Sequence, residues 1–200
     1  MKPGNDQTMV CILAGGLSQR MGCDKSRLRL GRHTLVGRLR ATLKDSGWPV
    51  RVLRRDVVER CGPLGGIYTA LRTARAGVVM FLACDMPFVS VAWLQQLRRG
   101  LRKKDRAVFT VAHDRVGFPL ILRRGELEFV KGQMAAGKFS LQDLALKTHA
   151  RQMHLPLARH HEAVNINTSA EWIRAKERVE LQRQESIHTA EKRASHADHR

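Results

Sequence analysis

Residues 13–25 read LAGGLSQRMGCDK, and they continue an apolar stretch, MVCIL, that is typical of a buried strand. The order is therefore strand, glycine turn and helix start. Adjacent glycines such as Gly15 and Gly16 let the backbone approach an anion without a Cβ in the way, and free amides at a helix N-terminus point at that anion. Arg20 and Lys25 add positive charge near the same turn. This run predicts a phosphate-binding turn.

The composition is strongly basic, with 36 Lys and Arg against 18 Asp and Glu, a formal net charge of +18. A field of that sign attracts anions in general. Aromatic residues make up only 5% of the chain, and the sequence carries no RNA-binding or helix-turn-helix signature. We therefore expect a solvated basic surface that suits anionic substrates and no specific nucleic-acid recognition; a basic nucleic-acid-binding protein is the alternative.

The chain has no apolar run near the roughly 18 residues that a membrane-spanning helix needs. Its first residues, MKPGNDQTM, lack the apolar core of a secretory signal. The four cysteines have no CxxC spacing, and Cys11 and Cys84 lie inside apolar runs, where a thiol packs as a small hydrophobe. We expect a cytoplasmic protein with structural thiols and no membrane association.

Apolar runs alternate with helical patterns, which predicts an α/β fold with a mainly parallel sheet and helices on both faces. Expected strands cover residues 10–14, 49–53, 78–84, 107–111, 120–122 and 151–155, and expected helices cover residues 35–46, 67–74 and 141–146. From about residue 175 apolar residues become sparse and both charge signs are mixed. We expect a domain over residues 1–174 and a frayed or disordered tail over residues 175–200.

Asp85 directly follows the most apolar predicted strand. A carboxylate there is costly to desolvate unless a cation or hydrogen-bond donors offset its charge, so Asp85 is a candidate ligand for Mg²⁺. Its alternative role is helix capping. Asn165 and Asn167 would share one face of an extended segment and could join this site. The alternative for them is the start of a helix at Asn167-Thr168-Ser169.

Five ordered motifs resemble those of molybdenum cofactor guanylyltransferases, the nucleotidyltransferases that join GTP to molybdopterin. They are LAGGLSQRMGCDK, GPLGG at 62–66, LACDMP at 82–87, FPLIL at 118–122 and VNINTSAEW at 164–172. The resemblance implies a Rossmann-like fold of the nucleotide-diphospho-sugar transferase type over residues 1–174. It also implies Mg²⁺-dependent transfer of GMP from GTP to molybdopterin, with release of pyrophosphate.

The resemblance carries over a set of functional residues. It places the nucleotide against Leu13, Ala14, Gly15, Gly16, Lys25, Asp56, Gly62, Pro63, Leu64, Gly65 and Asp85. Lys25, Asp85 and Arg20 would be catalytic, Asp85 would hold the metal, and Asn165 and Asn167 would bind the pterin. Residues 62–66 are expected as a loop beside the ribose or base.

One interval departs from the resemblance. The family carries a strand ending near an asparagine, then a helix and another strand, before the GPLGG motif, whereas only PVRVLRRDVVERC at 49–61 fills that place here. We expect a sheet shortened by about one strand-helix unit, with no counterpart of that asparagine. Asp56 lies in this interval, and its alternative role is a surface carboxylate beside Arg54, Arg55 and Arg60.

The nucleotide base that the protein prefers is inferred from the pair Gly15-Gly16. Relatives that use CTP open with LAAG, so Gly15 in place of alanine would leave room for the larger purine, and an alanine there should narrow the preference for GTP. The alternatives are a cytidylyltransferase acting on the same cofactor and a non-catalytic molybdopterin carrier, which would need neither Lys25 nor Asp85. A molybdenum-insertion protein and molybdoenzyme apoproteins are the expected protein partners.

Overall fold

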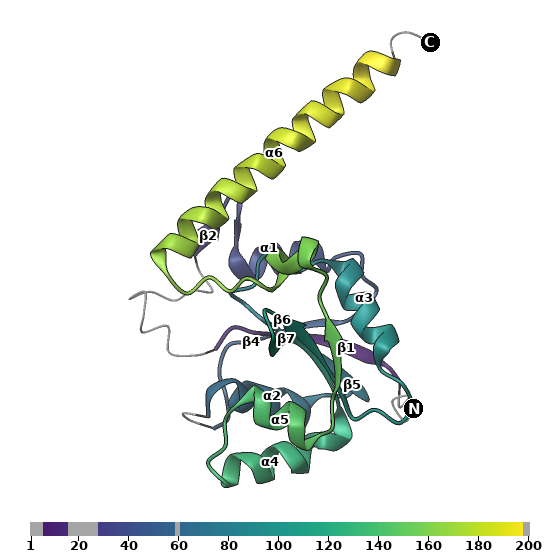
Figure 1. The fold of residues 1–200 in the computed structure, drawn as a ribbon, viewed down its shortest axis with the longest axis vertical. Coiled ribbons are helices and arrows are strands. Elements are labelled where there is room, and N and C mark those ends of the chain that lie inside the picture. The colour runs from purple at the N-terminus through teal and green to yellow at the C-terminus, as the bar shows by residue number, and fades with distance from the viewer. Residues whose placement is uncertain (1–5, 16–27, 59–60, 198–200) are drawn as a thin grey trace.

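The computed structural model describes residues 6–15, 28–58 and 61–197, with side chains as far as Gln184 (Figure 1). A six-stranded sheet forms its centre, in the order β4-β1-β5-β7-β6-β8. The strands are β1 (Thr8–Leu13), β4 (Val50–Leu53), β5 (Val78–Ala83), β6 (Ala107–Ala112), β7 (Arg115–Arg123) and β8 (Arg151–His154). β4, β1 and β5 run parallel, β6 and β8 run parallel, and β7 is antiparallel to both of its neighbours. The expected α/β fold with a mostly parallel sheet is confirmed.

The reversal at β7 follows from a tight turn. Only His113 and Asp114 separate β6 from β7, and their φ angles are 49° and 57°. Two central residues with positive φ form the turn type that joins antiparallel strands in a two-residue hairpin. A parallel arrangement of β6 and β7 would have required a long crossover instead.

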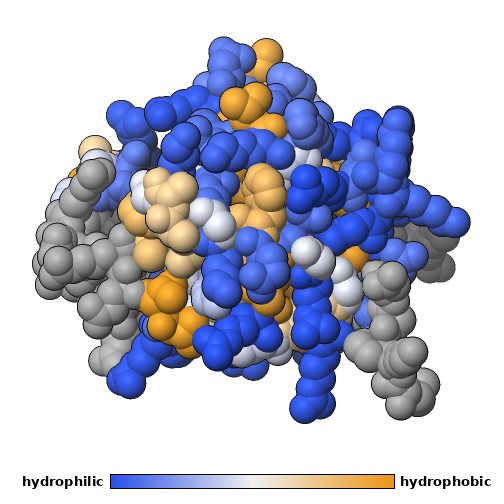
Figure 2. All heavy atoms as spheres, turned by 90° about the horizontal axis from the view of Figure 1, so that it is seen from below, coloured by the Kyte–Doolittle hydropathy of each residue, from blue (hydrophilic) through white to orange (hydrophobic). Residues whose placement is uncertain are grey.

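Helices cover both faces of the sheet, as expected (Figure 1). One face carries α1 (Leu35–Thr42) and α3 (Val91–Gly100), and the other carries α2 (Gly62–Thr73), α4 (Leu127–Ala135) and α5 (Leu141–Lys147). Strand residues alternate accordingly: Val10 and Ile12 pack toward α1 and α3, whereas Cys11 packs toward α2. Figure 2 shows the underside of the molecule, where hydrophilic residues surround smaller apolar areas.

The thiol of Cys11 behaves as the sequence indicates. The residue is fully buried in the core, and burial, the largest influence, raises the pKa of its thiol to about 11. Arg51 lowers that pKa and Asp56 raises it, both to a lesser extent. The thiol is therefore neutral near pH 7 and packs as an apolar group.

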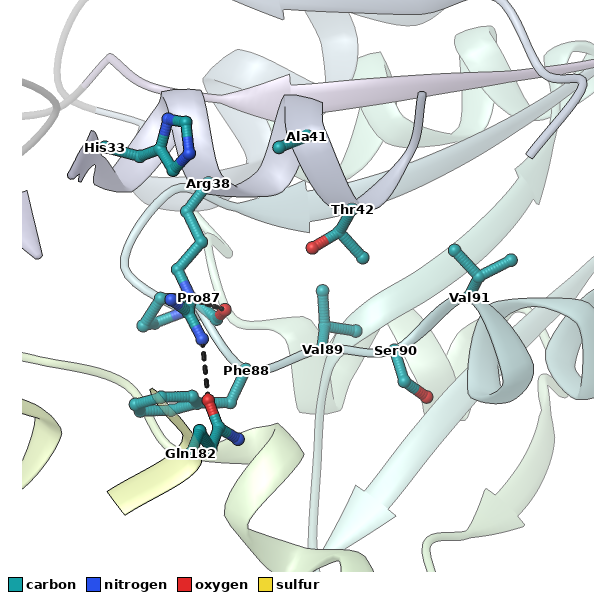
Figure 3. A pocket seen from close by; sticks show the side chains of 10 residues that line it. All are labelled: His33, Arg38, Ala41, Thr42, Pro87, Phe88, Val89, Ser90, Val91 and Gln182. Atoms are coloured by element: carbon teal, nitrogen blue, oxygen red, sulfur yellow. Dashed lines mark hydrogen bonds between the residues drawn. The ribbon is translucent and has the colours of Figure 1, made fainter. Parts of the chain in front are cut away.

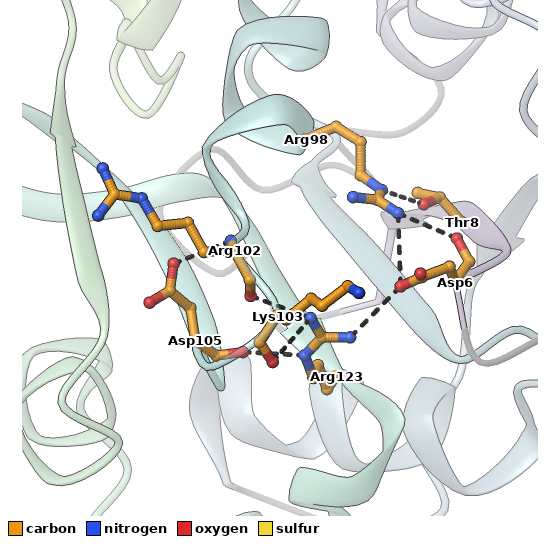
Figure 4. A network of polar contacts seen from close by, with 7 residues as sticks. All are labelled: Asp6, Thr8, Arg98, Arg102, Lys103, Asp105 and Arg123. Carbon is orange, nitrogen blue, oxygen red and sulfur yellow. Dashed lines mark hydrogen bonds and ion pairs between the residues drawn. The ribbon is translucent and has the colours of Figure 1, made fainter.

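A polar network ties together the amino-terminal ends of β1 and β6, away from the carboxyl ends where a ligand is expected (Figure 4). Arg98 donates to the Thr8 hydroxyl at 2.6 Å, and Arg123 donates to the Asp105 carbonyl at 2.9 Å. Arg123 also lies 3.6 Å from the Asp6 carboxylate. Part of the basic excess therefore has a structural use.

A second polar cluster joins the start of α3 to the 3-10 helix η3 (Leu157–Ala163). The Glu162 carboxylate, 5% exposed as a residue, accepts from Arg159 Nε at 2.6 Å and from the Ser90 amide at 2.9 Å. Burial alone would raise the pKa of Glu162, but these hydrogen bonds and the Arg159 charge outweigh it and lower that pKa. The cluster fixes the chain just before α3.

The last helix, α6 (Ser169–Ala197), begins with a capping box. Thr168 Oγ1 accepts from the Glu171 amide at 3.2 Å, and the Glu171 carboxylate accepts from the Thr168 amide at 2.8 Å. The helix packs on the small hairpin of β2 (Arg29–Leu30) and β3 (His33–Thr34). Leu30, Leu35, Ile166 and Ala175 form the core of this contact.

α6 passes residue 174 without a break and projects from the domain (Figure 1), so residues 175–197, for which a frayed or disordered tail is expected, are helical here. Ala175 is buried, Val179 packs against the hairpin, and the Gln182 side chain accepts from Arg38 at 2.9 Å. These three residues recur at helical spacing on one face, so few apolar residues suffice for docking. In the described part of the chain, no helix has the length and apolar character to cross a bilayer.

Candidate nucleotide site

The turn after β1 lies between the carboxyl ends of two neighbouring strands. The Ala14 amide donates to the Leu53 carbonyl of β4 at 2.7 Å, and the Leu13 carbonyl accepts from the Cys84 amide after β5 at 3.0 Å. Leu13, Ala14 and Gly15 therefore sit at the sheet edge where ligands bind in open α/β folds. Gly16, Arg20 and Lys25, which complete the predicted phosphate-binding turn, lie outside the described residues.

The backbone of Arg54 comes so close to residue 15 that glycine is required there. A Cβ at this position would lie 3.0 Å from the Arg54 carbonyl oxygen and 3.2 Å from the Arg54 carbonyl carbon. Both atoms belong to the backbone, which cannot rotate away as a flexible side chain can. The missing methyl group therefore makes room for the chain after β4, which gives a steric reason for glycine that does not depend on a nucleotide base.

Residues 62–66 do not form the expected loop, because α2 begins at Gly62. Pro63 fits the first turn of a helix, where its missing amide proton costs nothing, and Gly62 has a φ of +53°. Leu64 is fully buried in the core, and Gly65 is buried as well. The low helix propensity of glycine conceals this start in the sequence.

Asp56 packs against this first part of α2. An added Cβ on Gly65 would lie 3.1 Å from Asp56 Oδ2, and one on Gly66 would lie 3.4 Å from Oδ1 and 3.1 Å from Leu13 Cδ2. Glycine thus admits the carboxylate and the end of β1 to the surface of the helix. Asp56 is half-buried, and this burial raises its pKa. Leu13 and Asp56 therefore pack against Gly65 and Gly66, and these four residues form one wall.

Thr69 holds this wall in place, a role that sequence reasoning missed. Its hydroxyl donates to the Gly65 carbonyl at 2.8 Å and accepts from the Val57 amide at 3.0 Å. The loop that carries Asp56 is therefore fastened to the second turn of α2. A threonine inside a helical run gives no signal of this contact, because the contact depends on Val57, which is 12 residues away in the sequence.

Asp85 lies at the carboxyl end of β5, separated from the strand by Cys84 alone, and its Oδ1 atom is buried. Its backbone carbonyl accepts from the Ile166 amide at 2.9 Å, so the Asn165–Asn167 segment lies beside it. Ile166 is fully buried, Asn165 is exposed and Asn167 is half-buried, an alternation typical of extended chain. The Asn167 amide also donates to Glu171 at 2.7 Å, so the helix-start alternative applies to its backbone.

The donor set at this edge suits Mg²⁺. Among the described residues, no three His, Cys, Asp or Glu side chains gather into a metal cluster. Mg²⁺ does not need one, because it retains several waters and binds through one or two carboxylates together with substrate phosphates. Asp85 supplies such a carboxylate, and side-chain amides follow on the adjacent segment.

A glycine turn after the first strand and a carboxylate after a neighbouring parallel strand are typical of the ligand-binding edge of an open α/β sheet. Residues 10–149 match the model of the MobA-like NTP transferase domain. The chain belongs to this family and is a nucleotidyltransferase by membership.

Curated relatives agree with this assignment. A probable molybdenum cofactor guanylyltransferase of Opitutus terrae is 32% identical, over 84% of this chain and 91% of that protein. A molybdenum cofactor guanylyltransferase of Syntrophotalea carbinolica is 35% identical, over 65% of this chain and 70% of its own. The first alignment spans 186 positions but covers only 84% of these 200 residues, so this chain is gapped within it, consistent with the short interval before α2.

Solved structures share the fold. The molybdopterin-guanine dinucleotide biosynthesis protein A of Archaeoglobus fulgidus superposes with a TM-score of 0.72 at 20% identity, over 86% of this chain and 99% of its own. The 4-diphosphocytidyl-2C-methyl-D-erythritol synthase of Anaerococcus prevotii gives 0.68 at 12% identity, over 88% and 97%. The expected nucleotidyltransferase type of sheet is confirmed.

Proposed function

We propose that this protein transfers GMP from GTP to molybdopterin in a Mg²⁺-dependent reaction that yields the guanine dinucleotide cofactor and pyrophosphate. The names of the relatives support the guanylyl group and the acceptor. The observation that carries the proposal is the hydrogen bond of 3.0 Å between the Cys84 amide and the Leu13 carbonyl. It holds the end of β1, where the predicted phosphate-binding turn begins, next to the residue that precedes Asp85.

The reaction needs no covalent enzyme intermediate. A terminal phosphate oxygen of the acceptor forms a bond to the α-phosphorus of GTP, while the bond from that phosphorus to the bridging oxygen breaks and pyrophosphate leaves. Catalysis of this kind is mostly positioning and charge stabilisation. Backbone groups of Leu13, Ala14 and Gly15 would position the triphosphate, with Arg20 and Lys25 neutralising it.

The remaining residues divide between metal, base and acceptor. Asp85 would hold Mg²⁺, which when bound offsets negative charge on the phosphates. Asp56 would accept hydrogen bonds from the ribose or base, because its half-buried carboxylate lies on the wall beside Leu13. Asn165 and Asn167 would donate side-chain N–H groups to the acceptor's phosphate from the segment beside Asp85.

A nucleotide panel tests this proposal. Purified protein is incubated with molybdopterin, Mg²⁺ and either GTP, CTP, ATP or UTP, and products are identified by mass. We expect GTP to be used at least ten-fold more efficiently than CTP, the order of discrimination that pocket contacts supply. Equal use of CTP would overturn the guanylyl assignment. Tight binding of molybdopterin without transfer from any nucleotide would favour a carrier.

A further inference from the structure

A pocket of about 390 Å³ opens between α1, the residues that follow Asp85, and α6 (Figure 3). This volume lies within the range of small-molecule sites. Pro87, Phe88, Val89 and Val91 supply apolar walls, and Arg38 and Gln182 supply polar groups. None of the residues assigned above to the nucleotide, the metal or the acceptor lines it.

Two guanidinium groups contact Phe88, a residue of the pocket wall, and one of them, Arg38, lines the pocket itself. Arg38 and Arg178 each lie over the Phe88 ring, with 5.5 Å from the guanidinium carbon to the ring centroid in both cases. Arg38 comes from α1 and Arg178 from α6, so the two cations reach Phe88 from separate helices. Cation–π contact accounts for part of this arrangement, but it does not neutralise either charge.

Much of the hydrogen-bonding capacity of these groups is not used by the described residues. Arg38 donates from Nε to the Pro87 carbonyl at 3.1 Å and from Nη2 to Gln182, which engages two of its five N–H donors. Arg178 Nε is buried and has no acceptor within the described ranges. Neither guanidinium forms an ion pair with a carboxylate in that part of the chain.

Burial also disfavours the charged form of Arg38, because it lowers the pKa of this guanidinium. A partly desolvated guanidinium that lacks a carboxylate is stabilised when an anion binds beside it, and guanidinium groups match oxyanions well. The pocket also offers the Gln182 side chain, which already accepts from Arg38. Its chemistry therefore favours an oxyanion attached to a partly apolar molecule.

We propose that this pocket is a second anion site, which binds an oxyanion group of the acceptor substrate through Arg38, with Arg178 adding positive charge behind the Phe88 wall. The assignment to the acceptor rests on the proposed function and on two structural links. The pocket wall at Pro87 and Phe88 continues the chain from Asp85. The helix that carries Arg178 starts at Ser169, separated from the Asn165–Asn167 segment only by its cap residue, Thr168.

Inorganic phosphate is the first probe. It is titrated into ¹⁵N-labelled protein at constant ionic strength, with chloride as reference, and the side-chain amide of Gln182 is followed by NMR. This local signal separates the pocket from phosphate bound at the turn after β1. We expect saturable shifts in the native protein and affinity at least ten-fold lower in Arg38→Gln and Arg178→Gln. Absence of a phosphate-dependent shift at Gln182 in the native protein would overturn the site.

Matched controls come from the same helices. Arg40→Gln in α1 and Arg174→Gln in α6 remove the same charge at exposed positions and should bind phosphate within two-fold of the native protein. Equal losses in these controls would mean that net charge alone sets the affinity and would refute the site. Arg178→Gln keeps the hydrogen bond between Arg38 and Gln182, so it tests the site even where Arg38→Gln loosens α6.

Steady-state kinetics then identify the substrate. Arg38→Gln should raise the KM for the acceptor at least ten-fold while the KM for GTP stays within two-fold. A rise in the KM for GTP alone would place a nucleotide phosphate in the pocket and overturn the assignment to the acceptor. The phosphate titration does not require turnover, so a failure of the proposed function and a failure of this site give different results.

Discussion

Replacing Gly15 by alanine tests how the turn after β1 is built. The new methyl group would sit 3.0 Å from the Arg54 carbonyl oxygen, closer than real Cβ contacts normally come. That carbonyl follows β4, whose Leu53 carbonyl accepts from the Ala14 amide, so both sides of the overlap are held by strand pairing. Relief requires a backbone shift. We expect Gly15→Ala to lower the free energy of unfolding by about 1 to 3 kcal/mol, as for other overpacked positions.

Urea unfolding followed by circular dichroism measures this loss. Gly132→Ala is the matched control, because Gly132 lies inside α4 with nothing within 4 Å of an added Cβ. That substitution should raise stability by about 0.5 to 1 kcal/mol through helix propensity alone. Native stability in Gly15→Ala would refute the close approach to Arg54.

The same variant separates two explanations of base choice. A shifted turn disturbs phosphate contacts that GTP and CTP share, so transfer from both should fall by a similar factor and their ratio should stay within about three-fold of the native value. A selective loss of GTP use, with CTP use unchanged, would mean that the methyl group meets the purine. That result would restore the explanation that the sequence suggests and contradict the contact seen here.

Three further results are expected. Asp85→Ala should leave the circular dichroism spectrum unchanged and lower turnover at least about 10²-fold, as loss of a central electrostatic group does; near-native turnover in Mg²⁺ would contradict its role. Glu162→Gln should cost about 2 to 3 kcal/mol at pH 7 in urea unfolding. The folded pKa of Glu162 is lowered from an ordinary value of 4.5, so its contribution to stability is present above that value and is lost as the pH falls through the folded pKa. The stability of the variant should therefore depend less on acid pH than that of the native protein. Parallel profiles of stability against pH would contradict this role of Glu162. Removal of residues 185–200 should leave GTP transfer within a few-fold of native. Removal of residues 175–200 also deletes the docked Ala175 and Gln182 and should lower the melting temperature. Equal melting temperatures for the two truncated proteins would show that this docking contributes nothing to stability.

The sequence predicts the strands that bear the site, because their signal is local. The apolar run before Asp85 becomes β5, and the run before Gly15 becomes β1, each within two residues of its expected bounds. The spacing of Asn165 and Asn167 indicates an extended segment, and the structure adds the hydrogen bond that seats it beside Asp85. That bond joins residues far apart in the sequence and cannot be read from either motif.

Other features escape prediction for physical reasons that differ from case to case. α2 starts at Gly62 although glycine has low helix propensity, and Gly65 and Gly66 in its first turns admit Asp56 and Leu13 to the helix surface. The hairpin turn at His113 and Asp114 lacks the glycine that usually marks such turns. α3 and α4 were not expected at all, although Ser90 caps the start of α3 through the Trp93 amide at 3.2 Å.

The position of β4 has a consequence for how such a domain tolerates deletion. The outermost strand of a sheet pairs with one neighbour only. If such a strand is deleted, a single ladder of backbone hydrogen bonds is lost and the register of every inner strand pair stays intact. The boundary strand on this side, β4 (Val50–Leu53), is four residues long, carries Arg51 within it and is followed by Arg54. A short, positively charged border is a poor template for pairing between molecules. The sheet can therefore shorten from this side without becoming prone to self-association, while β1 and β5, which position the turn and Asp85, stay in its interior.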